Sequence, residues 1–314
     1  MAQQTRVGVV IPYFEAFLLR WPTLAELAAA SEEEVLRSWA GLGYYSRARN
    51  LLRCAQRAQA AGGLPRTAAQ LVELPGIGPY TAAAVASIAF GESVGLVDGN
   101  VQRVLSRLDG RTAEPTSAAG RAALWTRADA LQEARPDGSH PGDLNQALME
   151  LGALVCVPRQ PRCGACPVAE MCRAVAMGDP EALPARRSTR EPAPIRAVSG
   201  LLVFDEGVVL GRRPAGLLGG MWEPIGVELS ASDPPQEALQ RAFAERAGLR
   251  VSVDALRGQV VHVFTHRRLT CAVYAVSHQS GVLRRGEWYT HVRALRDPED
   301  VALSTLSRRI LDLV

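Results

Sequence analysis

Residues 144–172 read LNQALMELGALVCVPRQPRCGACPVAEMC, and this stretch holds four of the six cysteines in the 314-residue chain. The four are Cys156, Cys163, Cys166 and Cys172, with the spacing C-x6-C-x2-C-x5-C. Four thiolates can hold a zinc ion or an iron–sulfur cluster. Structural zinc sites typically use two short C-x2-4-C pairs, and this stretch has one. The uneven spacing therefore favours a [4Fe–4S] cluster over zinc, with a disulfide pair as a third alternative.

The composition is typical of an intracellular enzyme with more than one domain. A chain of 314 residues is long enough for two domains. Residues 1–20 lack the uninterrupted apolar core of a signal peptide, and no run of about eighteen apolar residues could cross a membrane. Clustered free thiols fit a reducing compartment, so we expect a cytoplasmic protein. The net charge of +3 permits DNA binding without arguing for it.

Sequence patterns divide the chain near residue 190. Helical periodicity runs from residue 10 to about residue 175, whereas residues 184–196 are rich in proline and charge and read as a linker. Strand-like and helix-like runs follow, namely 197–204, 208–210, 235–247 (helical) and 269–276. We therefore predict a multidomain chain, with an all-α domain over residues 1–183 and a smaller α+β domain over residues 197–314.

A glycine-containing turn precedes one of the predicted helices. Residues 74–91 read LPGIGPYTAAAVASIAFG, in which the turn Pro75-Gly76-Ile77-Gly78 leads into a helix that we expect to start near Pro79. Glycines let the backbone approach a ligand closely, and the amide groups at a helix start suit a phosphate. This is the helix–hairpin–helix pattern, which holds DNA backbone without reading sequence. Taken alone, it could equally be an ordinary helix-initiating turn.

A second motif, VDGNVQRV, occupies residues 97–104. Asp98 stands before a glycine at a probable helix start, where an aspartate commonly acts as an N-cap worth about 1 kcal/mol. The hairpin, this motif and the cysteine loop follow one another in the chain. That order argues for a role of Asp98 beyond capping.

Together these motifs resemble the endonuclease III superfamily of DNA glycosylases, and within it the MutY-type adenine DNA glycosylases over essentially the whole chain. Three further stretches carry the same resemblance: residues 3–5 (QQT), 11–14 (IPYF) and 41–51 (GLGYYSRARNL). The resemblance implies a base excision repair enzyme that removes adenine mispaired with 8-oxoguanine or guanine in double-stranded DNA. It also implies a [4Fe–4S] cofactor and a monomer that works at the nucleoid.

The resemblance assigns roles to particular residues. Gln4 and Tyr44 are expected to enter the duplex and hold it open, because the target base must leave the stack. Asp98 is expected to stabilise the positive charge that develops on the sugar, with a covalent adduct as an alternative form of this role, while Tyr80 and Asn100 line the same pocket. A plain alternative for the pair Tyr44-Tyr45 is packing at a helix end, which is reasonable for one of the two but less so for both.

The chain contains no lysine, since all 35 basic residues are arginine. Endonuclease III-like relatives place a lysine after the hairpin and cut the DNA strand through a Schiff base. Here the aligned residue is Tyr80, and only the α-amine could form an imine. We therefore predict a glycosylase without strand-cutting activity.

Residues 197–314 resemble the Nudix-related domain that MutY-type enzymes use to recognise 8-oxoguanine. A hydrolytic Nudix box requires R-E-x-x-E-E-x-G, whose glutamates bind magnesium. The chain has RAFAERAG at residues 241–248, so Ala242 and Arg246 replace two of the carboxylates. A nucleotide hydrolase is therefore the least favoured function.

Two loops of this second region carry the rest of the resemblance. Residues 217–223 (LLGGMWE) resemble its first loop, and Phe264-Thr265-His266 matches an F-S-H loop that contacts the lesion. Thr265 keeps the hydroxyl group of the serine and adds a methyl group. Without the resemblance, His266 would read as a turn residue in a hairpin.

One departure from the family concerns its catalytic glutamate, which lies in the segment E-V-M-L-Q-Q-T. The chain reads Met1-Ala2-Gln3-Gln4-Thr5, so that glutamate would lie two residues upstream of Met1. General acid catalysis by such a residue contributes roughly 10²–10⁴-fold. We expect that the protein starts further upstream rather than that the gene is truncated. The alternative function is a lesion-binding protein with impaired catalysis.

Overall fold

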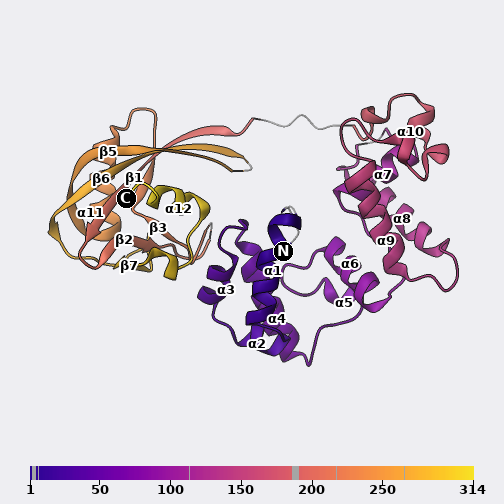
Figure 1. Cartoon of the computed structure of the whole chain (residues 1–314), viewed down its shortest axis with the longest axis horizontal. Helices are drawn as coiled ribbons and strands as arrows, with labels where there is room; N and C mark the ends of the chain where they lie inside the picture. Colours follow the sequence, from indigo (N-terminus) through magenta and orange to yellow (C-terminus); the bar gives the residue numbers. More distant parts are fainter. Residues whose placement is uncertain (2–4, 6, 113, 186–190, 217, 265) are drawn as a thin grey trace. The chain divides into compact units, whose positions relative to one another are not determined.

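The computed structural model describes residues 1–314 except 2–4, 6, 113, 186–190, 217 and 265 (Figure 1). Gln4 and Thr265, two of the predicted DNA contacts, therefore lie outside the described residues. The chain divides into two units, Met1–Gln56 together with Arg190–Val314, and Arg57–Thr189. The division falls inside helix α4 (Ser46–Ala60).

The unit formed by residues 57–189 is helical. Its helices are α5 (Ala68–Leu71), α6 (Pro79–Phe90), α7 (Gly99–Leu108), α8 (Ala118–Glu133), α9 (Pro141–Glu150) and α10 (Arg173–Ala176). Proline occupies the first turn of both α6 and α9, where a missing N–H costs nothing. The buried core is formed by Ala83, Leu96, Val101, Leu105, Leu124 and Ala128. This core packs α7 against α6 and α8.

The cysteine segment follows α9 directly and has short, irregular elements. A π-helical turn (Leu151–Val155) leads to Cys156, and 3₁₀ turns cover Cys163–Ala165, Ala169–Met171 and Pro180–Ala182. Both the π-helical turn and α10 contact α7, and Figure 1 shows α7, α9 and α10 side by side. The segment is therefore held against the helix that starts after Asp98.

The other unit begins with α1 (Val7–Arg20), α2 (Leu24–Ala29), α3 (Glu32–Trp39) and the start of α4. Capping boxes explain two of these helix starts. Thr23 and Glu26 form one at α2, while Ser31 and Glu34 form the other at α3. The helices bury a shared core whose largest members are Phe17, Trp21, Leu36, Trp39 and Tyr45.

A seven-stranded mixed sheet forms the rest of this unit, and its main order is β3-β2-β1-β6-β5. The strands are β1 (Ala193–Phe204), β2 (Gly207–Arg212), β3 (Trp222–Pro224), β4 (Gly226–Leu229), β5 (Leu249–Val263), β6 (Arg267–Gly281) and β7 (His291–Leu295). Strands β1 and β6 are parallel, whereas the other pairs are antiparallel. Residues 197–202 of β1 are all buried, as expected for a strand covered on both faces.

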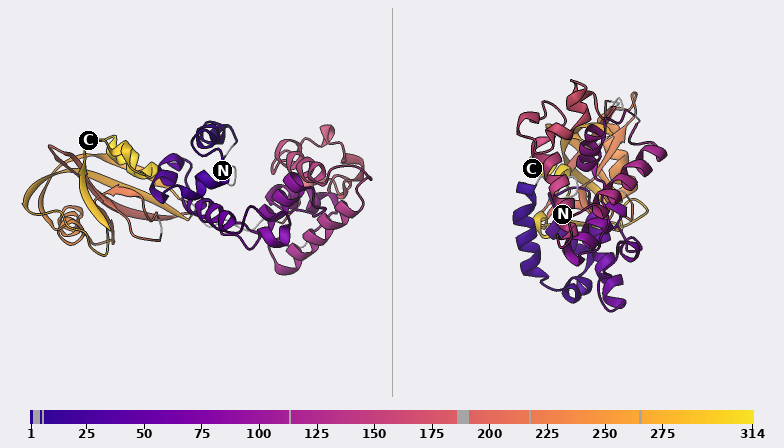
Figure 2. Two further views of the ribbon diagram at one scale, coloured as in Figure 1. Left: turned by 90° about the horizontal axis from the view of Figure 1, so that it is seen from below. Right: turned by 90° about the vertical axis from the view of Figure 1, so that its right-hand side faces the viewer.

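Helices α11 (Pro235–Ala247) and α12 (Thr305–Leu311) provide that cover. Phe243 of α11 packs into one core, and Ile310 of α12 packs into a second. Figure 2 (left) shows the orange α11 and the yellow α12 on opposite sides of the sheet. Gly248 ends α11 with φ +75°, a left-handed conformation that glycine adopts without strain.

The N-terminal helices contact the sheet region within this unit. The Tyr45 hydroxyl donates to the carbonyl of Leu303 at 3.4 Å, and Arg37 donates to the carbonyl of Asp300 at 3.1 Å. Met221 and Ala302 join the core of α1, α3 and α4. Residues 1–56 thus group with the C-terminal part of the chain, whereas the sequence placed them with residues 57–183. The predicted boundaries stay predictions.

The predicted fold class is confirmed, with a helical region followed by a smaller α+β region. The strands expected at 197–204, 208–210 and 269–276 lie in β1, β2 and β6, and the helix expected at 235–247 is α11. Strand β1 begins at Ala193, inside the stretch expected to be linker. Within the described part of the chain, no helix is both long and apolar enough to cross a membrane.

Candidate active site and cluster loop

Asp98 lies at the start of α7, where its carboxylate is held by two donors. Oδ1 accepts a hydrogen bond from the N–H of Val101 at 2.7 Å, and Oδ2 accepts one from Nδ2 of Asn100 at 3.3 Å. The side chain is half-buried. The predicted N-cap geometry is therefore present, and the carboxylate is also fixed in orientation by Asn100.

Tyr80, in the first turn of α6, lies within electrostatic reach of Asp98. Burial raises the pKa of Tyr80, and the negative charge of Asp98 raises it further. The Tyr80 hydroxyl donates to Sδ of Met149 at 3.4 Å. The structure thus brings together the three residues that the sequence placed in one pocket: Asp98, Tyr80 and Asn100.

Arg103 connects this group to the cysteine loop, a role that the sequence reading missed. Its Nη2 donates to Oδ1 of Asn100 at 2.9 Å and to the carbonyl of Gly152 at 2.6 Å, and its Nε donates to the carbonyl of Cys156 at 2.7 Å. Burial lowers the pKa of the Arg103 guanidinium. A Cβ on Gly152 would lie 2.6 Å from that of Asn100, so only glycine allows this close approach. A hydrogen-bonded chain therefore runs from Asp98 to the first cysteine.

Arg107, one turn further along α7, is 2% exposed and points at the same loop. Its donors reach one sulfur and three carbonyl oxygens: Cys156 Sγ (3.4 Å), Val157 (2.8 Å), Pro158 (3.1 Å) and Leu183 (2.8 Å). The thiol of Cys172 in turn donates to the carbonyl of Arg107 at 3.5 Å. The i, i+4 spacing of Arg103 and Arg107 was the sequence signal that both face one side of the helix.

The four cysteines fit an iron–sulfur cluster. All four are free thiols, half-buried, so the structure does not contain the disulfide alternative. Burial raises the pKa of Cys163, and the charges of the other three thiolates raise it further, which places all four within electrostatic reach of one another. Among the described residues, no three His, Cys, Asp or Glu side chains are grouped for one metal ion. In a cluster each thiolate binds a different iron, so the ligands need not converge on one point.

The hairpin turn before α6 is open to solvent. Gly76 has φ +77°, and Gly78 is the N-cap of α6 with no side-chain hydrogen bond to the helix start. A Cβ on Gly78 would meet nothing within 4 Å. Pro75, Gly76 and Gly78 therefore present a helix start with no side-chain cap, at which an anion could bind.

The two neighbouring tyrosines behave differently. Tyr45 is 5% exposed and packs in the core, as the plain alternative expected for one of the pair. Tyr44 is 48% exposed and has φ +49°, a left-handed conformation that is uncommon outside glycine. Arg47 lies 5.6 Å from the Tyr44 ring centroid and donates to the Gly43 carbonyl at 3.3 Å. The backbone therefore directs an aromatic side chain outward at this turn.

The residues at the positions of the Nudix box, 241–248, have packing roles in this structure. Ala242 is buried, while Glu245 is exposed. Arg246 lies 3.9 Å from the centroid of the Trp288 ring and donates to the carbonyl of Gly226 at 2.6 Å. A position that would carry a metal-binding carboxylate in a hydrolase thus holds a stacked arginine.

The predicted lesion-contact loop joins β5 to β6. The N–H of Phe264 donates to the carbonyl of Arg267 at 2.7 Å, and the Phe264 ring packs edge-on against His262. His266 is exposed, and its carbonyl accepts from the N–H of Ala193. His266 is therefore accessible at a hairpin turn.

Three family matches define the class of the protein. Residues 1–129 match the HhH-GPD superfamily base excision DNA repair protein family, and residues 198–313 match the NUDIX domain. Residues 156–172 match the iron–sulfur binding domain of endonuclease III, a span that begins at the first of the four cysteines and ends at the last. The prediction of a [4Fe–4S] cofactor is confirmed. The fold and the site define a helix–hairpin–helix base excision repair protein with a Nudix-like C-terminal domain.

Comparison with individual proteins narrows this class. The adenine DNA glycosylase of Rattus norvegicus is 37% identical over an alignment that covers 99% of this chain and 69% of that protein. The Homo sapiens adenine DNA glycosylase is 39% identical, with 88% of this chain and 59% of that protein covered. A solved thermostable thymine-DNA glycosylase matches with a TM-score of 0.50 and 29% identity, covering 56% of this chain and 80% of its own. The chain belongs to the adenine DNA glycosylase family.

Proposed function

We propose that the chain removes adenine from duplex DNA where adenine is paired with 8-oxoguanine or guanine. The observation that carries this proposal is the group at the start of α7, where Asn100 and Val101 orient the Asp98 carboxylate beside Tyr80. The group lies in the same unit as an open hairpin turn, in a chain whose relatives are named adenine DNA glycosylases.

The adenine must first leave the base stack, at a cost of a few kcal/mol. Tyr44 is suited to insertion because its backbone directs an exposed ring outward. The open turn at Pro75, Gly76 and Gly78 would bind backbone phosphate through amide groups and fix the register of the protein on the strand. Gln4 remains a proposed second wedge on the strength of the resemblance alone.

In the chemical step the C1′–N9 bond breaks and its electron pair leaves with the adenine. Positive charge then develops on the sugar ring, and the Asp98 carboxylate stabilises it in a preoriented position. A water molecule adds to C1′ and loses a proton, which leaves an abasic site. A proton delivered to the adenine ring makes it a better leaving group, and general acid catalysis of this kind contributes about 10²–10⁴-fold.

The resident cluster would hold the loop of Cys156–Cys172 in place as a structural support. Arg103 and Arg107 then hold this loop in a fixed position against α7, because both donate to carbonyl groups of the loop. Arg103 also donates to Asn100. Residues 144–175 form the cluster subdomain in this proposal.

Strand cleavage is not part of the proposed activity, since the sequence offers no lysine for a Schiff base. The Nudix-like residues 197–314 would instead recognise 8-oxoguanine through Thr265 and the exposed His266. Stacking of Arg246 on Trp288 argues against metal-dependent hydrolysis there. We propose that the chain acts as a monomer on nucleoid DNA.

The test is single-turnover excision on a duplex with one adenine opposite 8-oxoguanine. Abasic sites are revealed by alkali, and borohydride trapping reports any imine. Excision without trapping supports the proposal, whereas trapping at a side chain contradicts it. Tight duplex binding with no excision would favour the lesion-binding alternative, and a longer form that carries the family glutamate two residues before Met1 then tests whether that residue restores turnover.

A further inference from the structure

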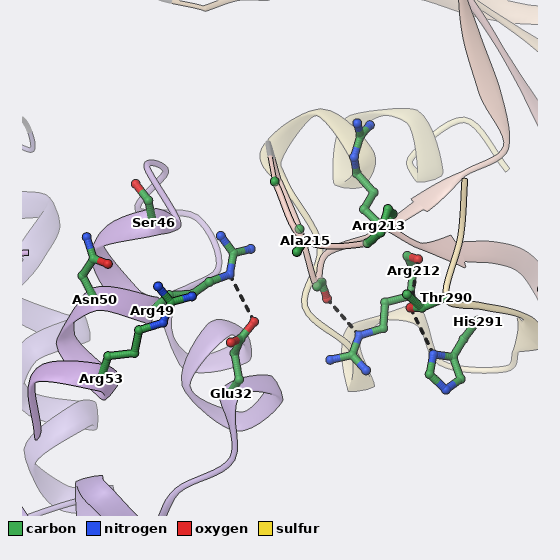
Figure 3. Close-up of a pocket in the computed structure, with 14 residues that line it drawn as sticks. Glu32, Ser46, Arg49, Asn50, Arg53, Arg212, Arg213, Ala215, Thr290 and His291 are labelled. Atoms are coloured by element: carbon green, nitrogen blue, oxygen red, sulfur yellow. Dashed lines mark hydrogen bonds and ion pairs between the residues drawn. The ribbon is translucent and has the colours of Figure 1, made fainter. Parts of the chain in front are cut away.

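A pocket of about 490 Å³ lies within the unit that contains the sheet. Figure 3 shows its two walls facing each other, with α3 and α4 on one side and the end of β2 with its following loop on the other. Each wall contributes two arginines, Arg49 and Arg53 from α4 and Arg212 and Arg213 from the end of β2. None of these residues has a role in the function proposed above.

Positive charge is in excess on the pocket surface. Glu32 is the single acidic lining residue, and it accepts from Nε of Arg49 at 3.1 Å. Two carboxylates outside the lining pair with the arginines of the other wall, Glu33 with Arg212 at 3.9 Å and Glu223 with Arg213 at 3.1 Å. Arg53 forms no hydrogen bond or ion pair with any residue that the structure describes.

One guanidinium nitrogen of a residue that lines the pocket lacks an acceptor. Nη2 of Arg49 is buried and has no acceptor among the described residues, although the Arg49 side chain is 12% exposed. A buried donor without an acceptor is rare in folded proteins and costly. Gly220, with φ +72°, lies on the opposite wall, and a Cβ there would be in ordinary van der Waals contact with this nitrogen at 3.9 Å. Protein atoms cover the nitrogen, so a ligand would reach it if the Arg49 side chain turned toward the pocket.

We infer that this pocket binds phosphate groups. Planar guanidinium groups match phosphate oxygens in geometry and in charge. Ser46 and Thr290 add hydroxyl donors to the lining, whereas His291 is its only aromatic ring, so the pocket offers little surface for stacking a base. Arginines on both walls suit two neighbouring phosphates, as in pyrophosphate or in consecutive nucleotides of a DNA strand.

Binding would also connect the two walls. The helical wall comes from residues before 54, and the other wall comes from residues after 211. A phosphate held by Arg53 and Arg212 together would bridge segments that are far apart in the chain. A ligand that binds only this arrangement stabilises it by mass action, so the unit should unfold at a higher temperature with ligand present.

The first experiment titrates the full chain with sodium pyrophosphate in chloride buffer, by calorimetry. Arg53→Gln removes a charged donor that pairs with no described residue, so the fold should be kept while the affinity for pyrophosphate falls about tenfold. Arg212→Gln should do the same from the other wall. Arg57→Gln is the matched control, because Arg57 is an exposed arginine one turn along α4 and outside the pocket.

The second arm separates the two sources of phosphate by measuring duplex affinity against salt concentration. If the pocket takes DNA backbone, Arg53→Gln lowers the slope of log affinity against log salt by about 1, and pyrophosphate competes with the duplex. If it takes a free polyphosphate, pyrophosphate affinity falls and the slope is unchanged. Either result supports the site. Equal pyrophosphate affinities and equal slopes for Arg53→Gln and Arg57→Gln would overturn it, whatever the excision rate.

Discussion

The start of helix α7 and the end of helix α11 both carry a sequence motif typical of a functional site, but the motif residues have opposite roles in the two helices. At the start of α7, Asp98, Asn100 and Arg103 form a hydrogen-bonded chain that ends at the cysteine loop. Near the end of α11, Ala242 is buried and Arg246 stacks on Trp288. The first helix links its motif residues in a polar network that includes a half-buried carboxylate, whereas the motif positions of the second helix pack against other residues.

Polar contacts alone do not mark an active site. The partners of Arg246 are a backbone carbonyl and an indole ring, and its buried Nε has no partner among the described residues. Arg103 instead bonds Asn100, which bonds the one carboxylate of the group. The network at α7 ends at a carboxylate, whereas the contacts of Arg246 end at a carbonyl and a ring. Four experiments test this difference.

The largest effect should follow removal of a cluster ligand. Cys163→Ser should abolish the binding of iron, and with it the absorption band at about 400 nm that iron–cysteine clusters show. Because binding of a metal centre is coupled to folding, the α7 region should lose its order while the sheet region keeps its protection from hydrogen exchange. Colourless wild-type protein with stoichiometric zinc would contradict the assignment.

Two other cysteines provide the matched control. Cys54 and Cys271 are buried and belong to the other unit of the chain, and burial raises the pKa of Cys271 to about 12. Cys54→Ala and Cys271→Ala should therefore keep the full absorption band. Loss of the band in either variant would show that the loop does not supply all of the ligands.

Much of the fold could be predicted from the sequence because its signals are local. The α11 helix has the bounds that periodicity gave, and α6 starts at Pro79 as proline and glycine placement indicated. Strand β5 was not recognised, since its pattern is largely exposed and register shifts interrupt its pairing with β6. Alternation fails as a signal where a strand bulges.

The parts that could not be predicted depend on contacts between distant segments. The bond from Tyr45 to Leu303 spans 258 positions, and the pocket walls also come from segments far apart in the chain, ending at Arg53 and beginning at Arg212. No periodicity or spacing reports such contacts. Asp98, Tyr80 and Asn100 were found because a motif and a resemblance named them. Arg103 and Arg107 were missed because a lysine-free chain has arginine at every basic position.

The second experiment asks whether Asp98 is more than a cap. Asp98→Asn should slow single-turnover excision by about 10³-fold, because it removes the charge that stabilises the sugar cation. Asparagine caps a helix as well as aspartate, so the unfolding free energy should change by less than about 0.5 kcal/mol. Asp98→Ser, which also caps, should be equally slow. Normal rates in both variants would leave Asp98 with a structural role only.

The third experiment tests the packing role of α11. Arg246→Gln loses the stack on Trp288 and the bond to Gly226, and we expect a loss of about 1.5 kcal/mol in urea unfolding, since Trp288 is half-exposed. Excision should be unchanged. Arg250→Gln, an exposed arginine on β5, should change stability by less than about 0.5 kcal/mol. Equal stabilities for the two variants would mean that the stack contributes nothing.

The smallest effect concerns α3, whose start is a cap with no chemistry and so shows what capping does by itself. The bonds that Ser31 donates to Glu34 lower the pKa of that carboxyl to about 2, and Arg20 adds to the effect. A lowered pKa means that the charged carboxylate stabilises the folded state above pH about 4.5, and that this contribution is lost as the pH falls towards 2.

Glu34→Gln keeps an acceptor for Ser31 but cannot titrate, so its unfolding free energy should fall less steeply over that range. Glu15→Gln, at an exposed position on α1, should titrate like the wild type. If the unfolding free energies of Glu34→Gln and the wild type fall in parallel with pH, the charge on Glu34 does not contribute and the cap stabilises α3 through its hydrogen bonds alone. A charge effect of Asp98 on excision would then have no counterpart at the cap of α3.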